Sequence, residues 1–154
     1  MKIIDLLDKS RIIADLQAKD KKGAVEELAA TLVSADKTLS QAKVVEVLLE
    51  RERLGSTGIG DNIAIPHGKL KNLGQLVISF GRSRTGVNFD SMDGKPTHLF
   101  FLLMAPENSV GIHLRALAKI SRMLKNPSFR QKLMEASDAE QIYSLIAEED
   151  ALLG

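Results

Sequence analysis

The chain has 154 residues, of which 44% are hydrophobic and 27% charged, and its formal net charge at pH 7 is +1. These values are ordinary for a globular protein with a substantial core, so we expect residues 1–154 to form a single domain. The lack of cysteine excludes disulfides, thiolate metal sites and thiol chemistry. No apolar run approaches the roughly 20 residues that span a membrane. The first acidic residue comes as early as Asp5, unlike in a signal peptide. We therefore expect no membrane insertion and a cytoplasmic location.

Charges are distributed unevenly along the C-terminal third of the chain. Six basic residues and no acidic one occur from Arg115 to Lys132, whereas six acidic residues and no basic one occur from Glu135 to Asp150. Two solvated surfaces would explain this pattern, and so would a basic docking surface for an acidic partner protein. Nucleic acid is not expected as a partner, because the chain has one Tyr, no Trp and no known binding motif.

The N-terminal part predicts a short helix or turn, an extended piece around residues 12–16, and then two helices. Apolar residues at three- and four-residue spacing predict the first helix over residues 21–34. A hydroxyl N-cap within residues 38–40 begins the second, which runs to about Arg53 and is ended by Gly55. The expected buried face of this second helix comprises Ala42, Val45, Leu48 and Leu49.

The middle of the chain predicts strands. Residues 63–65 are interpreted as the end of a strand, because a following proline favours an extended conformation. β-branched and aromatic residues predict a buried strand over residues 76–80, and residues 86–89 are a candidate for a further short strand. The most apolar stretch, residues 97–104, is expected to be a central strand.

Three more helices are predicted near the C-terminus. They run from about Gly111 to Leu124, from near Pro127 and from near Asp138. Helices at both ends of the chain and strands between them predict an α/β fold in which helices cover the faces of a sheet.

One of the three histidines stands out. His67 lies between Pro66, which fixes its own φ, and Gly68, which tolerates unusual φ values. A glycine-rich loop, residues 55–60, comes shortly before it. We interpret this arrangement as one imidazole on a stiff turn, accessible to a large partner such as a phosphoryl donor protein.

The other two histidines have simpler interpretations. His113 is in line with the apolar face of the predicted helix over residues 111–124. It is either a hydrogen-bonded histidine at the edge of the core or a second imidazole beside His67. His98 begins a predicted strand and is interpreted as structural. The sequence separation of His67 and His113 matches no recognised metal-ligand pattern, so no metal site is predicted.

The glycine-rich loop and the helix before it carry groups that suit phosphate. Arg51 is either a cation that suits a helix C-terminus or a guanidinium aimed at a phosphate. The hydroxyl groups of Ser56 and Thr57 are candidates to donate hydrogen bonds to phosphate oxygens. The loop is neither a Walker A loop nor a dinucleotide fingerprint, and no nucleophile-elbow motif surrounds Ser56, so neither a nucleotide nor a serine hydrolase is indicated.

Two stretches closely resemble the phosphohistidine signature of the fructose/mannitol/nitrogen class of enzyme IIA, a component of the phosphoenolpyruvate-dependent phosphotransferase system. They are residues 51–60, Arg-Glu-Arg-Leu-Gly-Ser-Thr-Gly-Ile-Gly, and residues 63–68, Ile-Ala-Ile-Pro-His-Gly. Further matching residues follow in the expected order as far as His113-Leu114. The resemblance covers nearly the whole chain and implies a mixed parallel and antiparallel sheet sandwiched between helices.

The resemblance also implies roles for individual residues. His67 corresponds to the phosphorylated nucleophile, reacting through Nε2, and His113 and Arg51 to its active-site neighbours. The implied donor is a phosphohistidine carrier protein, and no cofactor is required. The chain is most similar to the nitrogen-regulatory branch, which implies regulatory target proteins as partners. The alternative is a sugar-specific fructose or mannitol IIA that passes its phosphoryl group to a IIB transporter subunit.

Overall fold

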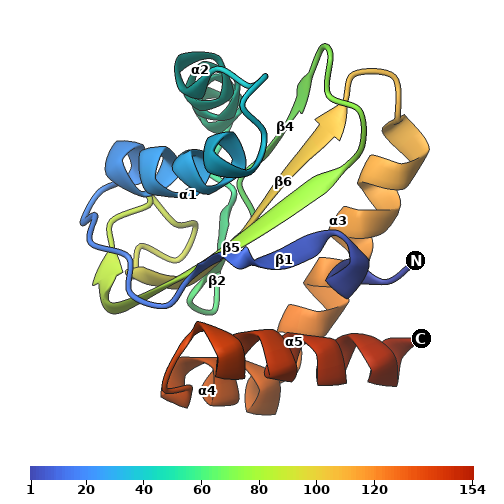
Figure 1. Cartoon of the computed structure of the whole chain (residues 1–154). Helices are drawn as coiled ribbons and strands as arrows, with labels where there is room; N and C mark the ends of the chain where they lie inside the picture. The colour runs from blue at the N-terminus through green and yellow to red at the C-terminus, as the bar shows by residue number, and fades with distance from the viewer.

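The computed structural model describes all residues, Met1–Gly154, and has three layers (Figure 1). A six-stranded sheet has α1 and α2 on one face and α3, α4 and α5 on the other. The elements in chain order are a 3-10 turn (Ile3–Asp5), β1 (Leu7–Ile13), α1 (Lys21–Ala35), α2 (Gln41–Arg53), β2 (Gly58–Gly60), β3 (Ile63–Ala64), β4 (His67–Leu70), β5 (Val77–Val87), β6 (Thr97–Pro106), α3 (Val110–Leu124), α4 (Pro127–Glu135) and α5 (Ala139–Leu153). No helix combines the length and apolar character that a membrane crossing requires. The predicted α/β class, with a mixed sheet sandwiched between helices, is confirmed.

The sheet is built around β6, as the apolar run of residues 97–104 predicted. The strand order is β1-β5-β6-β3-β2, and β4 also pairs with β6. β5 is antiparallel to β6, whereas β3 and β4 are parallel to it, and β1 is parallel to β5. Every residue from Leu99 to Ala105 is buried, because β6 has strands at both edges and helices on both faces.

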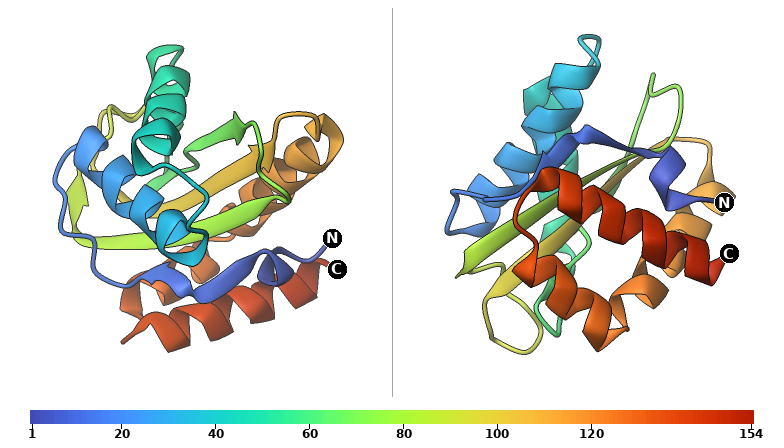
Figure 2. Two further views of the ribbon diagram at one scale, coloured as in Figure 1. Left: turned by 45° about the horizontal axis from the view of Figure 1, so that its top comes forward. Right: turned by 60° about the horizontal axis from the view of Figure 1, so that its bottom comes forward.

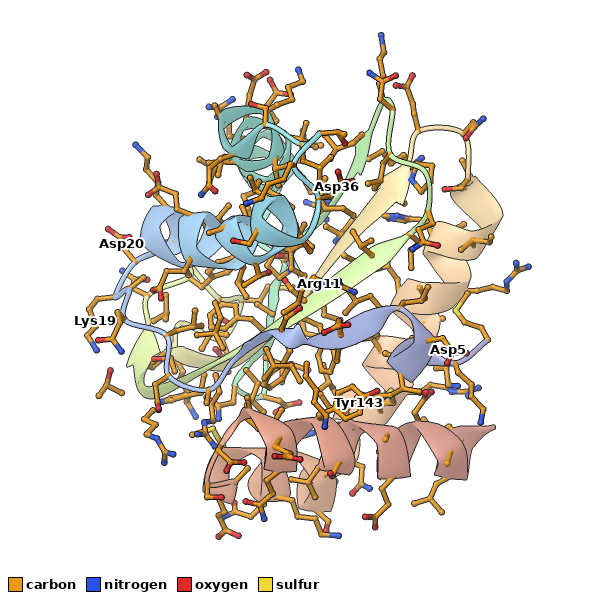
Figure 3. All side chains as sticks on the ribbon, in the orientation of Figure 1. Asp5, Arg11, Lys19, Asp20, Asp36 and Tyr143 are labelled. Carbon is orange, nitrogen blue, oxygen red and sulfur yellow. The ribbon has the colours of Figure 1, made fainter.

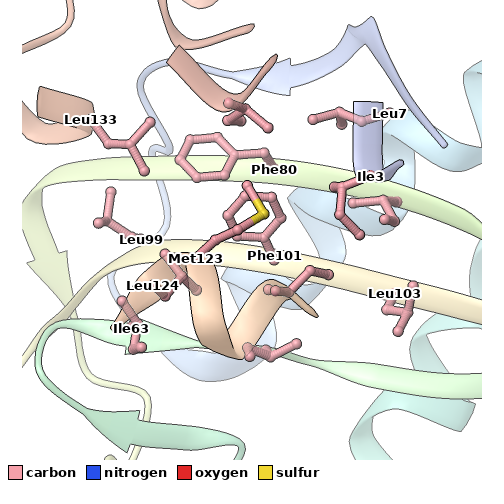
Figure 4. Packing of buried hydrophobic residues seen from close by; sticks show 14 of the residues in the cluster. Ile3, Leu7, Ile63, Phe80, Leu99, Phe101, Leu103, Met123, Leu124 and Leu133 are labelled. Carbon is pink, nitrogen blue, oxygen red and sulfur yellow. The ribbon is translucent and has the colours of Figure 1, made fainter. Parts of the chain in front are cut away.

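The two faces of β6 belong to two separate apolar cores. Successive residues of a strand point to opposite faces, so Phe100 and Phe101 enter different cores. Phe101 packs edge-to-face on Phe80, with ring centroids 5.0 Å apart, in the core beneath the C-terminal helices (Figure 4). Phe100 packs in the same way on Phe89 under α1 and α2, at 5.2 Å. Figure 2 shows these two groups of helices on opposite sides of the sheet.

The predicted helices are present, but the predicted buried face of α2 is only partly correct. Ser40 caps α2 by accepting a hydrogen bond from the Lys43 main-chain N–H, and Asp138 caps α5 in the same way. In α2, however, Val44, Leu48 and Glu52 are buried, while Ala42 is exposed and Val45 and Leu49 are only half-buried. The helix packs against both α1 and β4, and this rotates its buried stripe away from the expected face.

Two strand predictions also differ from the structure. β1 begins at Leu7, earlier than expected, because its register with β5 shifts between Leu7 and Ile12 and the usual alternation is lost. Arg11, whose side chain is labelled in Figure 3, bridges this irregularity by donating to the carbonyl groups of Leu6 and Ile78, both at 3.0 Å. The segments 76–80 and 86–89, expected as separate strands, belong largely to one strand, β5, whose register shifts between Arg82 and Val87.

The two charge runs are not separate surfaces throughout. Lys119 and Asp150 form a buried ion pair at 2.6 Å, with side chains 8% and 1% exposed. Lys119 also donates to the carbonyl of Met1 at 2.7 Å, and Asp150 accepts from the main-chain N–H of Ile4 at 3.0 Å. Neither a solvated surface nor a docking surface therefore describes these two residues, because each is the internal partner of the other.

Candidate active site

A groove of about 780 Å³ lies between the end of α2 and the start of α3, beside β4. Arg51, His67 and His113 all line it. The structure thus brings together three residues that are distant in sequence and that were each singled out as a candidate. Arg51 comes from the last turn of α2, His67 from the first position of β4 and His113 from the first turn of α3.

His67 begins a strand and does not lie on a turn, which corrects the expectation from sequence. It pairs in parallel with Leu103 of β6. The carbonyl of Pro66 accepts a hydrogen bond from the Leu103 N–H at 2.9 Å, so the segment is already attached to the central strand before the histidine. The sequence did not indicate β4, because a strand of four residues containing glycine has no recognisable pattern and is defined only by its pairing with β6.

A hydrogen bond determines which nitrogen of His67 carries the ring proton. Nδ1 lies 2.8 Å from the carbonyl oxygen of Ile65. A carbonyl oxygen can only accept, so Nδ1 carries the ring proton and Nε2 keeps its lone pair. The geometry therefore leaves available the nitrogen that the family resemblance implied as the attacking atom.

His113 lies beside His67 and is also largely buried. The two ring centroids are 5.4 Å apart, with the rings tilted by 60°, and His113 is only 5% exposed. His113 is thus the second imidazole of the groove and lies at the edge of the core, but it is not hydrogen-bonded as the structural interpretation expected, because its buried Nδ1 has no hydrogen-bond partner.

Lowered pKa values favour the neutral form of both imidazoles at pH 7. Burial is the main reason why the pKa of His67 lies below its ordinary value of 6.5; the hydrogen bond to Ile65 opposes this, Arg51 lowers the pKa further and Glu52 raises it. Burial likewise lowers the pKa of His113, with smaller contributions from His67 and Lys69. A neutral imidazole with a free lone pair is a competent nucleophile.

The groove carries more cations than were predicted. Arg51 Nη1 donates to the carbonyl oxygen of Gly55 at 2.8 Å, which anchors the guanidinium at the rim. Arg53 and Lys69 also line the groove, whereas Glu50 is its only acidic residue. Lys69 was missed because β4 was missed: alternate residues of a strand share a face, and Lys69 follows His67 by two positions. The excess of positive charge suits a phosphoryl group.

Ser56 and Thr57, the predicted phosphate-binding residues, do not line the groove. Ser56 Oγ donates to the carbonyl of Phe89 at 2.8 Å and accepts from the N–H of Gly58 at 3.0 Å. Thr57 is 4% exposed, and its hydroxyl group donates to the carboxylate of Glu52. Both hydroxyl groups are therefore occupied by internal hydrogen bonds, and we do not include them in the candidate phosphate site.

Outside the groove, the ring of His98 is hydrogen-bonded to the side chain of Asn62, in keeping with its structural interpretation. The structure contains no group of three or more His, Asp or Glu side chains that could hold a metal ion.

Exposed apolar side chains line the groove beside the histidines: Leu54 is 85% exposed, Val110 51% and Leu114 59%. Such residues around a polar site are typical of a protein docking surface.

The chain is similar over almost its whole length to known proteins. It is 44% identical over 147 residues to a nitrogen regulatory protein of Bradyrhizobium diazoefficiens. This alignment covers 96% of this chain and 95% of that protein. It is 38% identical over 150 residues to the fructose-specific EIIABC component of Bacillus subtilis, covering 97% of this chain but 24% of that protein.

Solved structures agree with these similarities. The crystal structure of nitrogen regulatory protein IIA-Ntr from Neisseria meningitidis has a TM-score of 0.87 at 40% identity, covering 94% of this chain and 98% of that one. IIA mannitol from Escherichia coli, at 22% identity, shares the fold with a TM-score of 0.77. The family model described as phosphoenolpyruvate-dependent sugar phosphotransferase system, EIIA 2, matches residues 5–149. The resemblance seen in the two signature stretches is confirmed, and the chain belongs to the EIIA type 2 family of this phosphotransferase system.

Proposed function

We propose that this protein is a phosphocarrier that accepts a phosphoryl group on Nε2 of His67 from a phosphohistidine carrier protein. One observation carries the proposal above all: the hydrogen bond from His67 Nδ1 to the Ile65 carbonyl leaves the Nε2 lone pair free in a groove rich in cations. Membership of a family of phosphotransfer components supports it.

In the proposed reaction, Nε2 of His67 attacks the phosphorus atom of the donor's phosphohistidine. The new N–P bond forms as the donor's N–P bond breaks, and the donor imidazole leaves with the electron pair of that bond. Such a transfer requires mainly alignment and charge neutralisation. Arg51 and Lys69 neutralise the phosphoryl oxygens, and the ring of His113 lies beside the reacting ring, with the two centroids 5.4 Å apart. Leu54, Val110 and Leu114 contact the donor and exclude water.

We further propose that the protein belongs to the nitrogen-regulatory branch, in which the phosphorylation state of His67 changes binding to target proteins. Its similarity to nitrogen regulatory proteins extends over nearly their full length. A second candidate is a sugar-specific IIA that donates to a IIB subunit. The observation that favours it is the similarity to the fructose-specific protein of Bacillus subtilis.

The test of the phosphocarrier role is a labelling assay with phosphoenolpyruvate and the general phosphotransferase proteins. We expect one acid-labile phosphoryl group in the wild type and none in His67→Ala, measured by intact mass spectrometry. His98→Gln is the matched control and should be labelled as fully as the wild type. Equal labelling of His67→Ala would contradict the proposal.

The branch is tested by adding purified IIB subunits to the phosphorylated protein. Rapid loss of the label to a IIB subunit supports the sugar-specific alternative. Retention of the label, together with a target protein that binds only one phosphorylation state, supports the regulatory role.

A further inference from the structure

A buried carboxylate lies next to the candidate active site without lining its groove. Glu52 is 6% exposed and follows Arg51 in the last turn of α2. Its Oε1 accepts a hydrogen bond from the main-chain N–H of Thr57 and forms an ion pair with the ammonium group of Lys21, both at 3.1 Å. Its Oε2 accepts a hydrogen bond from the hydroxyl group of Thr57. A buried carboxylate is costly unless it is paired and hydrogen-bonded, so this set of contacts holds Thr57 in one place.

Thr57 is connected to His67 through the main chain. Its carbonyl oxygen accepts the N–H of Ile65 at 3.1 Å, and the carbonyl oxygen of Ile65 accepts Nδ1–H of His67 at 2.8 Å. On the other side, the carbonyl of Pro66 accepts the N–H of Leu103 in β6 at 2.9 Å. The oxygen that selects the tautomer of His67 is therefore held between the central strand and Thr57.

The same carboxylate also stabilises the loop that contains Gly55, to which Arg51 is hydrogen-bonded. The guanidinium donates to the carbonyl of Gly55, at 2.8 Å, and Gly55 lies between Glu52 and Thr57. Gly55 has φ +143°, a conformation that favours glycine, and its N–H is bonded to the main-chain carbonyl of Glu52. The contact between Glu52 and Thr57 closes this short loop, so it contributes to the positions of both the proposed nucleophile and its neighbouring cation.

We infer that Glu52 and Thr57 are positioning residues for phosphoryl transfer: Glu52 holds Thr57, which holds the Ile65 carbonyl that keeps the proton on Nδ1 of His67. This inference rests on the proposed function, in which His67 is the nucleophile. Neither residue contacts the phosphoryl group. When the carbonyl is displaced, the ring also adopts the tautomer protonated at Nε2, and that form has no lone pair at the reacting atom.

Four variants distinguish an effect on the position of the His67 ring from a general loss of folding stability. Thr57→Val keeps the shape of the side chain but removes the hydroxyl group, and Thr57→Ser keeps the hydroxyl group. Glu52→Gln removes the charge and keeps an acceptor oxygen. Asp150→Asn is the matched control, because Asp150 is also a buried carboxylate that pairs with a lysine and a main-chain N–H, in the helical layer on the other face of the sheet. Thermal unfolding gives the loss of stability of each variant.

The first readout is the nitrogen NMR spectrum of the His67 ring in the unphosphorylated protein. We expect the proton on Nδ1 alone in the wild type, Thr57→Ser and Asp150→Asn, and a mixture of tautomers in Thr57→Val and Glu52→Gln. The second readout is the rate of phosphoryl transfer per folded molecule. We expect it to fall about tenfold in Thr57→Val and Glu52→Gln, and to stay within about twofold of the wild type in the other two variants.

A wild-type tautomer and a wild-type rate in Thr57→Val would overturn the inference. An equal loss of rate in Asp150→Asn would also overturn it, because general destabilisation would then be the cause. If the wild type accepts no phosphoryl group at all, the proposed function fails, while the ring spectra of the four variants still decide whether Glu52 and Thr57 position His67.

Discussion

At the residue scale, opposing effects determine the charge of His67. Burial and the nearby guanidinium of Arg51 favour the neutral ring, whereas the carbonyl of Ile65 and the carboxylate of Glu52 favour the protonated ring. The balance lowers the pKa below the ordinary value of 6.5. The imidazole therefore keeps its nucleophilic lone pair at neutral pH and retains it further into the acidic range than a free histidine does.

This balance predicts the titration of His67. We expect its midpoint, measured by NMR, to lie below 6.5 in the wild type. In Arg51→Gln the midpoint should rise, because a positive charge that disfavours protonation is removed. Arg122→Gln, an exposed arginine of α3 outside the groove, serves as the control and should not change it. A midpoint above 6.5 in the wild type would show that burial does not dominate.

His113 allows a kinetic prediction. Its ring centroid lies 5.4 Å from that of His67, so replacing it by glutamine removes a neighbour of the His67 ring but leaves the proposed nucleophile intact. We expect phosphoryl transfer to slow by about tenfold to a hundredfold while labelling still reaches completion. Single-turnover kinetics measure this effect. A wild-type rate in His113→Gln would restrict His113 to a packing role.

At the scale of elements, the groove exists because α2 can approach β4 closely. A Cβ atom on Gly68 would lie 2.7 Å from Cγ1 of Val47, so the glycine permits the contact between helix and strand. The last turn of α2 carries Arg51, and the strand begins with His67. The absence of one side chain thus brings the guanidinium and the imidazole to the same groove.

Substitution of Gly68 tests this packing. Gly68→Val should push α2 away from β4, lower the free energy of unfolding by about 1–3 kcal/mol and slow phosphoryl transfer. Gly74→Val is the comparison, because a Cβ atom at Gly74 would meet no atom within 4 Å. Denaturant unfolding and transfer kinetics check both effects. Similar behaviour of the two variants would show that the close approach at Gly68 is unimportant.

At the scale of the whole molecule, one buried ion pair joins both ends of the chain. Lys119 of α3 and Asp150 of α5 hold the first residues through the carbonyl of Met1 and the N–H of Ile4, and the two termini lie near each other (Figure 1). Burial alone would raise the pKa of Asp150, but Lys119 and main-chain N–H groups keep it below the ordinary value of 3.8. Its contribution to stability is therefore present above pH 3.8 and is lost as the pH falls through the lower folded value.

Removing one partner of this pair should lower the free energy of unfolding far more than removing both. Lys119→Met leaves a buried carboxylate without its counter-charge, and we expect the free energy of unfolding to fall by about 3 kcal/mol. The double variant Lys119→Met with Asp150→Leu should recover most of this loss, because no unpaired charge remains. Urea unfolding of both single variants and of the double variant completes the cycle. Additive losses would mean that the two residues do not interact.

The sequence by itself determined what depends on near neighbours. Some features are set by residues only a few positions apart. The caps at Ser40 and Asp138 and the apolar run of β6 led to correct predictions of two helices and the central strand. The unusual Pro66-His67-Gly68 led to a candidate residue, His67, that lines the groove. The membership of Arg51 and His113 in that groove was also foreseen, through resemblance to a known family. Their catalytic roles stay predictions.

Only the tertiary structure decided what depends on distant partners. β4 exists because it pairs with β6, Lys119 is buried because Asp150 neutralises it, and the hydroxyl group of Thr57 turns to Glu52 and away from the groove. The tautomer of His67 depends on a carbonyl whose position is set by a loop and a strand from other parts of the chain. Local preferences choose helices, strands and caps, but burial and hydrogen bonding between distant segments decide which side chains face the groove and in which protonation state.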